Sequence, residues 1–148
     1  MHDERTDHEN VVDQWLTRAN GSSADRLLDL LEASLRLIWS RARRTLGDRT
    51  LGAVVGRVLY TSSEAYPFLG SLRVGTGGIR FDDLRAEIDA VAPTELFGAV
   101  RFVVTELLDV LGHLTAGILT PALHAELLTA RLSGSYARFG KARIGSRP

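Results

Sequence analysis

Cysteine is missing from this sequence of 148 residues, and its absence excludes several kinds of chemistry. Without thiols the chain can form no disulfide bond, no thiolate metal site and no cysteine nucleophile. An excess of one charge is missing too, because 18 basic residues balance 18 acidic ones. A neutral chain is atypical of proteins that bind nucleic acid over their whole surface, although it leaves room for a local basic patch.

Long apolar runs are also missing. No window approaches the roughly 18 consecutive apolar residues of a membrane-spanning helix, and the most apolar stretch is interrupted by Arg101, Glu106, Asp109 and His113. The N-terminus is acidic and polar, whereas a secretory signal needs a basic start and an apolar core. These absences predict a cytoplasmic protein with no membrane span.

The apolar residues that are present recur at intervals of three and four, which is the spacing of packed helices. We therefore expect an all-α fold, a compact bundle of five or six helices around a central apolar helix at about 94–117. The chain has the length of one domain. Its composition predicts a disordered acidic tail at 1–9, a single helical domain at 10–132 and a flexible basic tail at 133–148.

Glycine, proline and capping residues predict where the helices begin and end. Gly52 and Gly56 form a small-residue pair that would let another helix approach closely. Residues 72–81 form either a short β-hairpin or a glycine-rich loop. The first expected helix is 10–19, the second is capped by Ser22 or Ser23 and ends at Gly47, and the third is 48–65, stopped by Pro67. The fourth is capped by Asp82 or Asp83 and closes before Pro93, and the fifth is capped by Thr94. The sixth is opened by Thr120 and Pro121.

The second of these helices carries apolar residues in a/d spacing. Such a stripe exceeds what one short bundle needs, so it favours helix–helix contact with a partner or with a second copy. The residues expected in this seam are Leu28, Leu31, Leu35 and Ile38.

The fifth helix carries a polar stripe of Arg101, Thr105, Asp109 and His113. In a purely structural interpretation, this stripe is a solvated or interhelical face. Carboxylate and imidazole groups at this spacing also suit a zinc or iron site in a helical bundle. The candidate ligands for such a site are Glu106, Asp109, His113 and His124.

Other constellations are weaker. The sequence Gly75-Thr76-Gly77-Gly78 lacks the lysine and the following helix start of a phosphate-binding loop, so we interpret it as a turn. No serine, threonine or carboxylate is accompanied by the pattern of an activated nucleophile. We therefore expect no enzyme activity and no cofactor.

Basic residues gather in two places, at Arg36, Arg41, Arg43, Arg44 and Arg49, and in the last 18 residues. The tail residues Arg138, Lys141 and Arg143 lie among aromatic side chains, a combination that can bind single-stranded nucleic acid. The leading hypothesis is a non-catalytic regulatory or adaptor module that contacts a protein partner or forms a homodimer. The alternatives are a metal- or cofactor-binding bundle and nucleic-acid binding through the basic tail.

Overall fold

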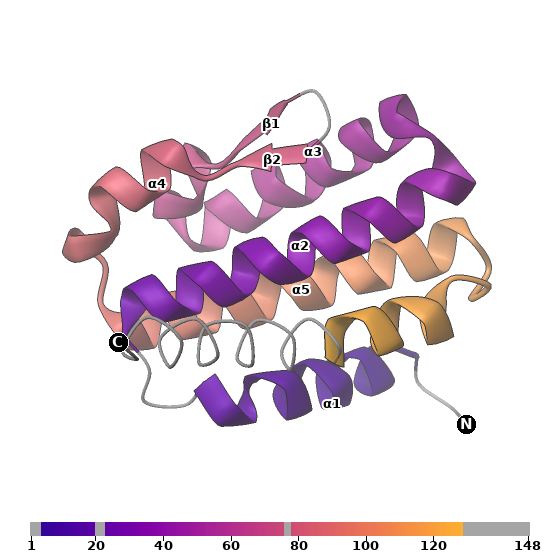
Figure 1. The fold of residues 1–148 in the computed structure, drawn as a ribbon, viewed down its shortest axis with the longest axis horizontal. Coiled ribbons are helices and arrows are strands. Elements are labelled where there is room, and N and C mark those ends of the chain that lie inside the picture. The colour runs from indigo at the N-terminus through magenta and orange to yellow at the C-terminus, as the bar shows by residue number, and fades with distance from the viewer. Residues whose placement is uncertain (1–3, 20–22, 76–77, 129–148) are drawn as a thin grey trace, which may run out of the picture.

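The computed structural model describes residues 4–19, 23–75 and 78–128 (Figure 1). Over this part it is the predicted all-α bundle with one small hairpin. Its helices are α1 (Glu4–Leu16), α2 (Ala24–Leu46), α3 (Asp48–Ala65), α4 (Asp82–Glu87), α5 (Pro93–Leu114) and a helix over 120–128; its 3-10 turns are η1 (Thr17–Ala19), η2 (Pro67–Ser71) and η3 (Ile88–Ala90); its strands are β1 (Arg73–Gly75) and β2 (Gly78–Arg80).

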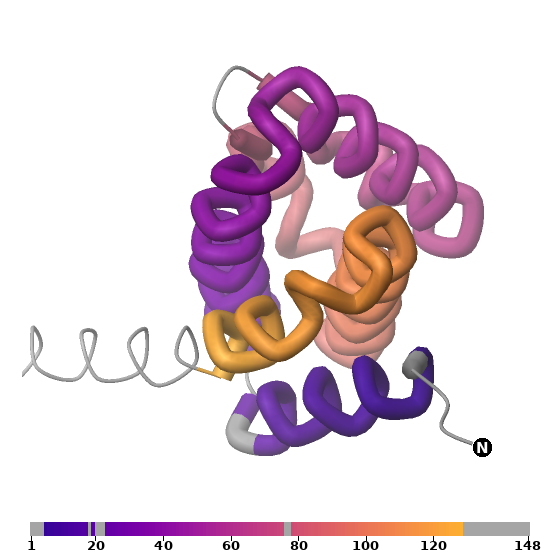
Figure 2. The backbone as a smooth tube through the Cα atoms, turned by 90° about the vertical axis from the view of Figure 1, so that its right-hand side faces the viewer, coloured from indigo at the N-terminus to yellow at the C-terminus, as the bar shows by residue number. Residues whose placement is uncertain are grey.

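Helix α5 is the centre of the bundle, as predicted. It packs against α1, α2 and α3, and Figure 2 shows α1 below it, α3 above it and α2 to its left. Its buried apolar residues spread over about half of its circumference, as Ala99, Leu107 and Leu108 illustrate. A helix with so little polar surface has to lie inside the fold, because exposing that area to water would cost roughly 25 cal/mol per Å².

Several helix ends match the expected signals. The Ser23 side chain accepts a hydrogen bond from the Arg26 N–H, which caps α2. Gly47 has φ of 83° and separates α2 from α3 within one residue, a conformation that suits glycine. The expected cap at Thr94 is wrong: Ala92 is the N-cap of α5, and Pro93 occupies its first turn. Proline suits that position because the N–H it lacks would have no helical partner.

The first helix begins six residues earlier than expected. Residues 4–9, expected to belong to a disordered tail, form the first turns of α1. The prediction failed because these residues are fixed by polar contacts, which apolar periodicity does not reveal. His8 is fully buried, and Arg5 pairs with carboxylates of α5.

Residues 73–75 and 78–80 form the two strands of the hairpin, with Val74 opposite Ile79 in an antiparallel register. The glycine pair of α3 receives this hairpin, whereas a second helix was expected. A Cβ added at Gly52 or Gly56 would lie 3.8 Å or 3.9 Å from the methyl groups of Val74. The flat face of α3 thus supports a two-stranded sheet, which is only marginally stable in isolation.

Helix α4 is fastened to α2 by an ionic cluster. Arg85 donates to Asp29 over 2.9 Å and to Glu32 over 2.5 Å. Burial lowers the pKa of Arg85, but its hydrogen bonds to the two carboxylates outweigh this effect, and the net shift is upward.

Two helix glycines should respond oppositely to alanine. We expect Gly56→Ala to raise the free energy of unfolding by about 0.5–1 kcal/mol, because alanine favours the helix and its Cβ makes only ordinary contacts. We expect Gly98→Ala to lower it, because the new Cβ would lie 3.0 Å from the Tyr66 hydroxyl. Urea unfolding measures both. Adding Tyr66→Phe should rescue Gly98→Ala, and equal stabilisation by the two alanines would contradict this packing.

The predicted seam of α2 lies inside the single chain. Its four residues have at most 2% of their surface exposed and belong to one continuous core. These side chains cannot meet a partner while α2 stays in place, so an interaction surface has to be sought elsewhere. The seam residues are Leu28, Leu31, Leu35 and Ile38.

Candidate functional site

The polar stripe of α5 faces α1. Arg5 donates to Glu106 over 2.5 Å and to Asp109 over 3.3 Å. Two turns further along α1, Asp13 accepts two hydrogen bonds from Arg101, over 2.6 Å and 3.2 Å. Because positions ascend on α1 while they descend on α5, the two helices run antiparallel. The interhelical interpretation of this stripe is the one the structure supports.

The cation of Arg5 occupies the place between the two carboxylates. Its hydrogen bond to Glu106 raises the pKa of Arg5 above its usual value, in spite of partial burial. An arginine stays charged at all physiological pH values. Glu106 and Asp109 therefore share one permanent cation, which offsets one of their two negative charges and weakens their attraction for a metal ion.

The two histidines proposed as metal ligands do not join that cluster together: His113 lies at its edge, with Nδ1 3.7 Å from Asp109 Oδ1, and His124 is elsewhere. His113 has 72% of its side chain exposed, and its Nδ1 lies 2.8 Å from the backbone oxygen of Asp109. His124, on helix 120–128, contacts His8 instead. Within 4–19, 23–75 and 78–128, no three histidine, aspartate or glutamate side chains converge as metal ligands would.

The contact between His8 and His124 was not predicted. His8 Nδ1 lies 2.8 Å from His124 Nε2, a hydrogen-bond distance, and the rings meet edge to face. His8 is fully buried and His124 is partly buried. Nothing in the sequence pairs residues so distant. The only available signal was the position of His8 on the same helical face as Val12 and Trp15.

A cleft of about 370 Å³ lies between α2 and β2. Its apolar part includes Trp39, Ile79 and Phe81. Its charged groups are paired with one another, Arg36 with Glu32 and Arg43 with Asp48, so no unbalanced charge selects a ligand; these pairs have lengths of 3.2 Å and 3.1 Å. The buried indole N–H of Trp39 finds no acceptor within the described residues, but it has almost no accessible surface. A ligand in the cleft could not reach it unless the ring moved.

One end of the bundle combines positive charge with exposed apolar side chains. Residues 41–49 contain four arginines and one aspartate, a net charge of +3. Arg43 pairs with Asp48, whereas the other three form no ion pair with any residue the structure describes. We call Arg41, Arg44, Arg49, Leu114 and Ile118 the basic end.

The apolar members of the basic end are the last residue of α5, Leu114, and Ile118 on the turn that follows. Leu114 is 53% exposed and Ile118 is 78% exposed. The turn is tightened by hydrogen bonds from Ala116 N–H to the His113 oxygen and from Gly117 N–H to the Gly112 oxygen. This pattern is a Schellman motif, which requires a left-handed residue. Alanine fills that position with φ of 52°, at a cost of about 1–2 kcal/mol.

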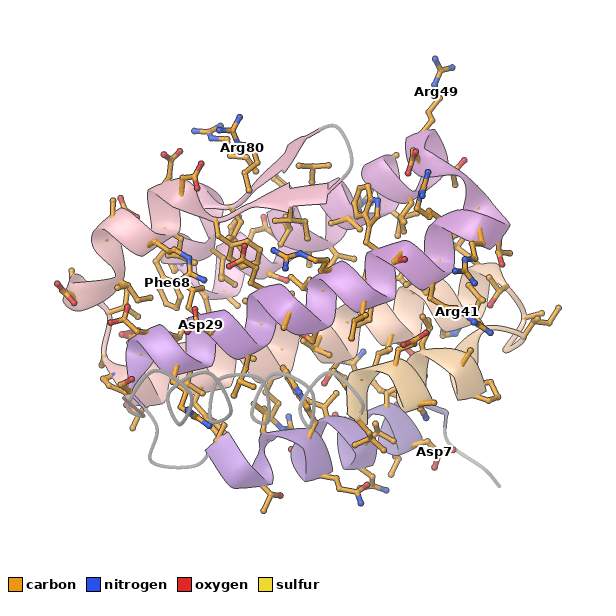
Figure 3. All side chains as sticks on the ribbon, in the orientation of Figure 1. Asp7, Asp29, Arg41, Arg49, Phe68 and Arg80 are labelled. Carbon is orange, nitrogen blue, oxygen red and sulfur yellow. The ribbon has the colours of Figure 1, made fainter. Side chains whose placement is uncertain are left out.

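The arginines and the turn lie at the same end of the molecule. Figure 2 looks onto this end, and both the α2–α3 corner and the turn after α5 face the viewer. Figure 3 places Arg41 between α2 and that turn, and Arg49 at the outer corner of α3. The arginines form a visible cluster in the sequence, but Leu114 and Ile118 do not, because their place at the same end depends on the fold.

The predicted tail residues Arg138, Lys141 and Arg143 lie outside the described residues, as does the rest of 133–148. Of the helices that the structure describes, none combines the length and the apolar character needed to cross a bilayer. Comparison with protein-family models, with curated proteins and with solved structures finds no match for this chain.

Proposed function

We propose that this chain is a non-catalytic adaptor or regulatory module that binds an acidic, partly apolar protein surface at its basic end. The observation that carries the proposal is the set of three arginines without ion-pair partners in the described chain, at the same end of the bundle as Leu114 and Ile118. Arginine and apolar anchors are characteristic of the energetic centres of protein interfaces.

Charge supports an acidic partner. The chain as a whole is neutral, so the +3 of residues 41–49 is a local feature that attracts acidic surfaces over about one Debye length, roughly 8 Å at physiological salt. A second copy presenting the same surface would be repelled. The apolar seam of α2, which first suggested self-association, is buried in the core.

The apolar residues support a protein partner in particular. Large apolar side chains are buried almost everywhere else in the described chain, and only Tyr60 is exposed to a similar degree. The phosphates of nucleic acid would attract the arginines but would gain nothing from contact with the two aliphatic side chains. A partner that covers Leu114 and Ile118 would also remove apolar surface from water.

The test compares three labelled probes by fluorescence anisotropy: an acidic amphipathic peptide of glutamate and leucine, a single-stranded oligonucleotide and phosphatidylserine vesicles. We expect the full chain to bind the peptide best. Arg44→Glu with Arg49→Glu, and separately Leu114→Ser with Ile118→Ser, should each weaken peptide binding roughly tenfold or more, about 1.4 kcal/mol.

Arg57→Glu is the matched control, because Arg57 is exposed on the same helix as Arg49 but lies two turns away. It should leave peptide binding nearly unchanged. Tighter binding of the oligonucleotide or of the vesicles would contradict a protein partner. Equal losses from Arg57→Glu would show general charge attraction without a defined surface.

A further inference from the structure

Helix α1 is held to the bundle by polar contacts at both ends and by apolar contacts between them. Arg5 binds α5 near the start of α1, and Asp13 binds Arg101 further along. Val12 and Trp15 lie completely buried on the same helix. These contacts join α1 to elements far away in the sequence, so α1 can leave as a unit if they weaken.

The His8–His124 pair is a contact of α1 whose chemistry changes with mild acid. A hydrogen bond between two imidazoles needs one nitrogen that donates and one that accepts. With no added proton, or with one, the 2.8 Å contact can be kept. When both rings are protonated, each facing nitrogen is a donor, and two cations stand in contact.

Burial raises the free energy of the doubly protonated state. His8 has no surface accessible to water, so a charge on it cannot be solvated. The chain that has released α1 can protonate both rings as the pH falls through about 6.5. The released form therefore takes up more protons than the docked form, and acid favours release.

The surrounding charges decide at which pH the second proton binds and α1 is released. The charged groups nearest to the pair along α1 and helix 120–128 are Arg5, Asp7, Glu9 and Glu126. Helix α5 contributes Glu106 and Asp109, which bind Arg5. Carboxylates among them favour the first proton, which the hydrogen bond tolerates. Arg5 offsets one of the two negative charges of Glu106 and Asp109, and its own positive charge opposes a second proton on the histidine pair.

We propose that the buried His8–His124 pair is an acid-operated latch that holds α1 against α5 and helix 120–128 at neutral pH and releases it in mild acid. Release would expose Trp15 together with the part of α5 that α1 covers, and would leave the α2–α3–α5 core in place. The latch does not depend on the basic end, which lies on other residues.

Trp15 reports the release directly. The sequence contains only two tryptophans, so in a Trp39→Phe background all indole emission comes from Trp15. Between about pH 7.5 and pH 5, where imidazole changes charge, we expect the full chain to show a red shift of this emission and a several-fold rise in acrylamide quenching. Most of the helical circular dichroism should persist.

His124→Gln tests the cause, because an amide can partner His8 but takes up no proton in this range. It should keep Trp15 buried down to pH 5, and His113→Gln, at an exposed histidine of the same bundle, should leave the response unchanged. If His124→Gln folds poorly, histidine NMR of the unsubstituted chain decides instead: two rings must titrate together with Trp15 exposure. Burial of Trp15 throughout, an unchanged response in His124→Gln, or loss of the whole helical signal together with Trp15 exposure would overturn the latch.

Discussion

Leu31→Asp should cost at least about 4 kcal/mol of the free energy of unfolding. Leu31 has no exposed surface in the centre of the α2 seam. Removing its side chain alone costs about 2–5 kcal/mol, and the aspartate adds a charge without water or a partner. A domain of this size is stable by only about 5–15 kcal/mol. Urea unfolding followed by circular dichroism should therefore show a greatly lowered midpoint or a partly unfolded chain.

Leu114→Asp is the control, since it makes the same change of side chain at a position that is 53% exposed. Surface substitutions of this kind usually alter stability by no more than about 0.5 kcal/mol. If both aspartates had similar effects, α2 would not be packed as described. If Leu31→Asp changed only the oligomeric state, the seam would lie between chains.

Trp15→Ala should lower the free energy of unfolding by about 3–5 kcal/mol, the range for removing a large buried aromatic side chain. Trp15 has no exposed surface and lies in the same continuous core as α5. Thermal unfolding should show a lower melting temperature, and hydrogen exchange should show the largest loss of protection in α1.

Tyr60→Ala provides the comparison, because this aromatic side chain is 68% exposed. It should change stability by no more than about 0.5 kcal/mol. A melting temperature for Trp15→Ala close to that of the unsubstituted chain would mean that α1 adds little to the core. The latch would then have little to release.

Apolar spacing and punctuating residues predicted the helices that depend on local chemistry. Gly47 ends the second helix and Pro67 stops the third, and each acts through its own backbone. The start of α1 escaped prediction because it depends on Arg5 and His8, whose partners lie more than 100 residues away. Periodicity measures how a segment buries apolar surface, and it carries no information about such polar contacts.

The candidate site also has a part that the sequence reveals and a part that depends on the fold. The arginines of the α2–α3 corner are visible in the sequence as a cluster. In the sequence, Leu114 and Ile118 lie at and just beyond the end of the predicted apolar helix, and nothing there marks them as exposed. Their exposure results from the early end of α5 at Leu114 and from the turn around Ala116. The metal hypothesis paired residues by helical spacing alone and could not foresee that Arg5 would reach Glu106 first.

The antiparallel contact of α1 with α5 has a consequence for how the chain is made. Arg5 and Asp109 are separated by 104 positions, so α1 leaves the ribosome long before the helix that receives it. At 5–20 residues per second the delay is on the order of ten seconds. Throughout that interval Trp15 and Val12 have no core to enter. Helix α1 is synthesised well before α5 and is thus among the last elements able to dock. A nascent chain that does not yet contain α5 presents an apolar segment that chaperones can recognise.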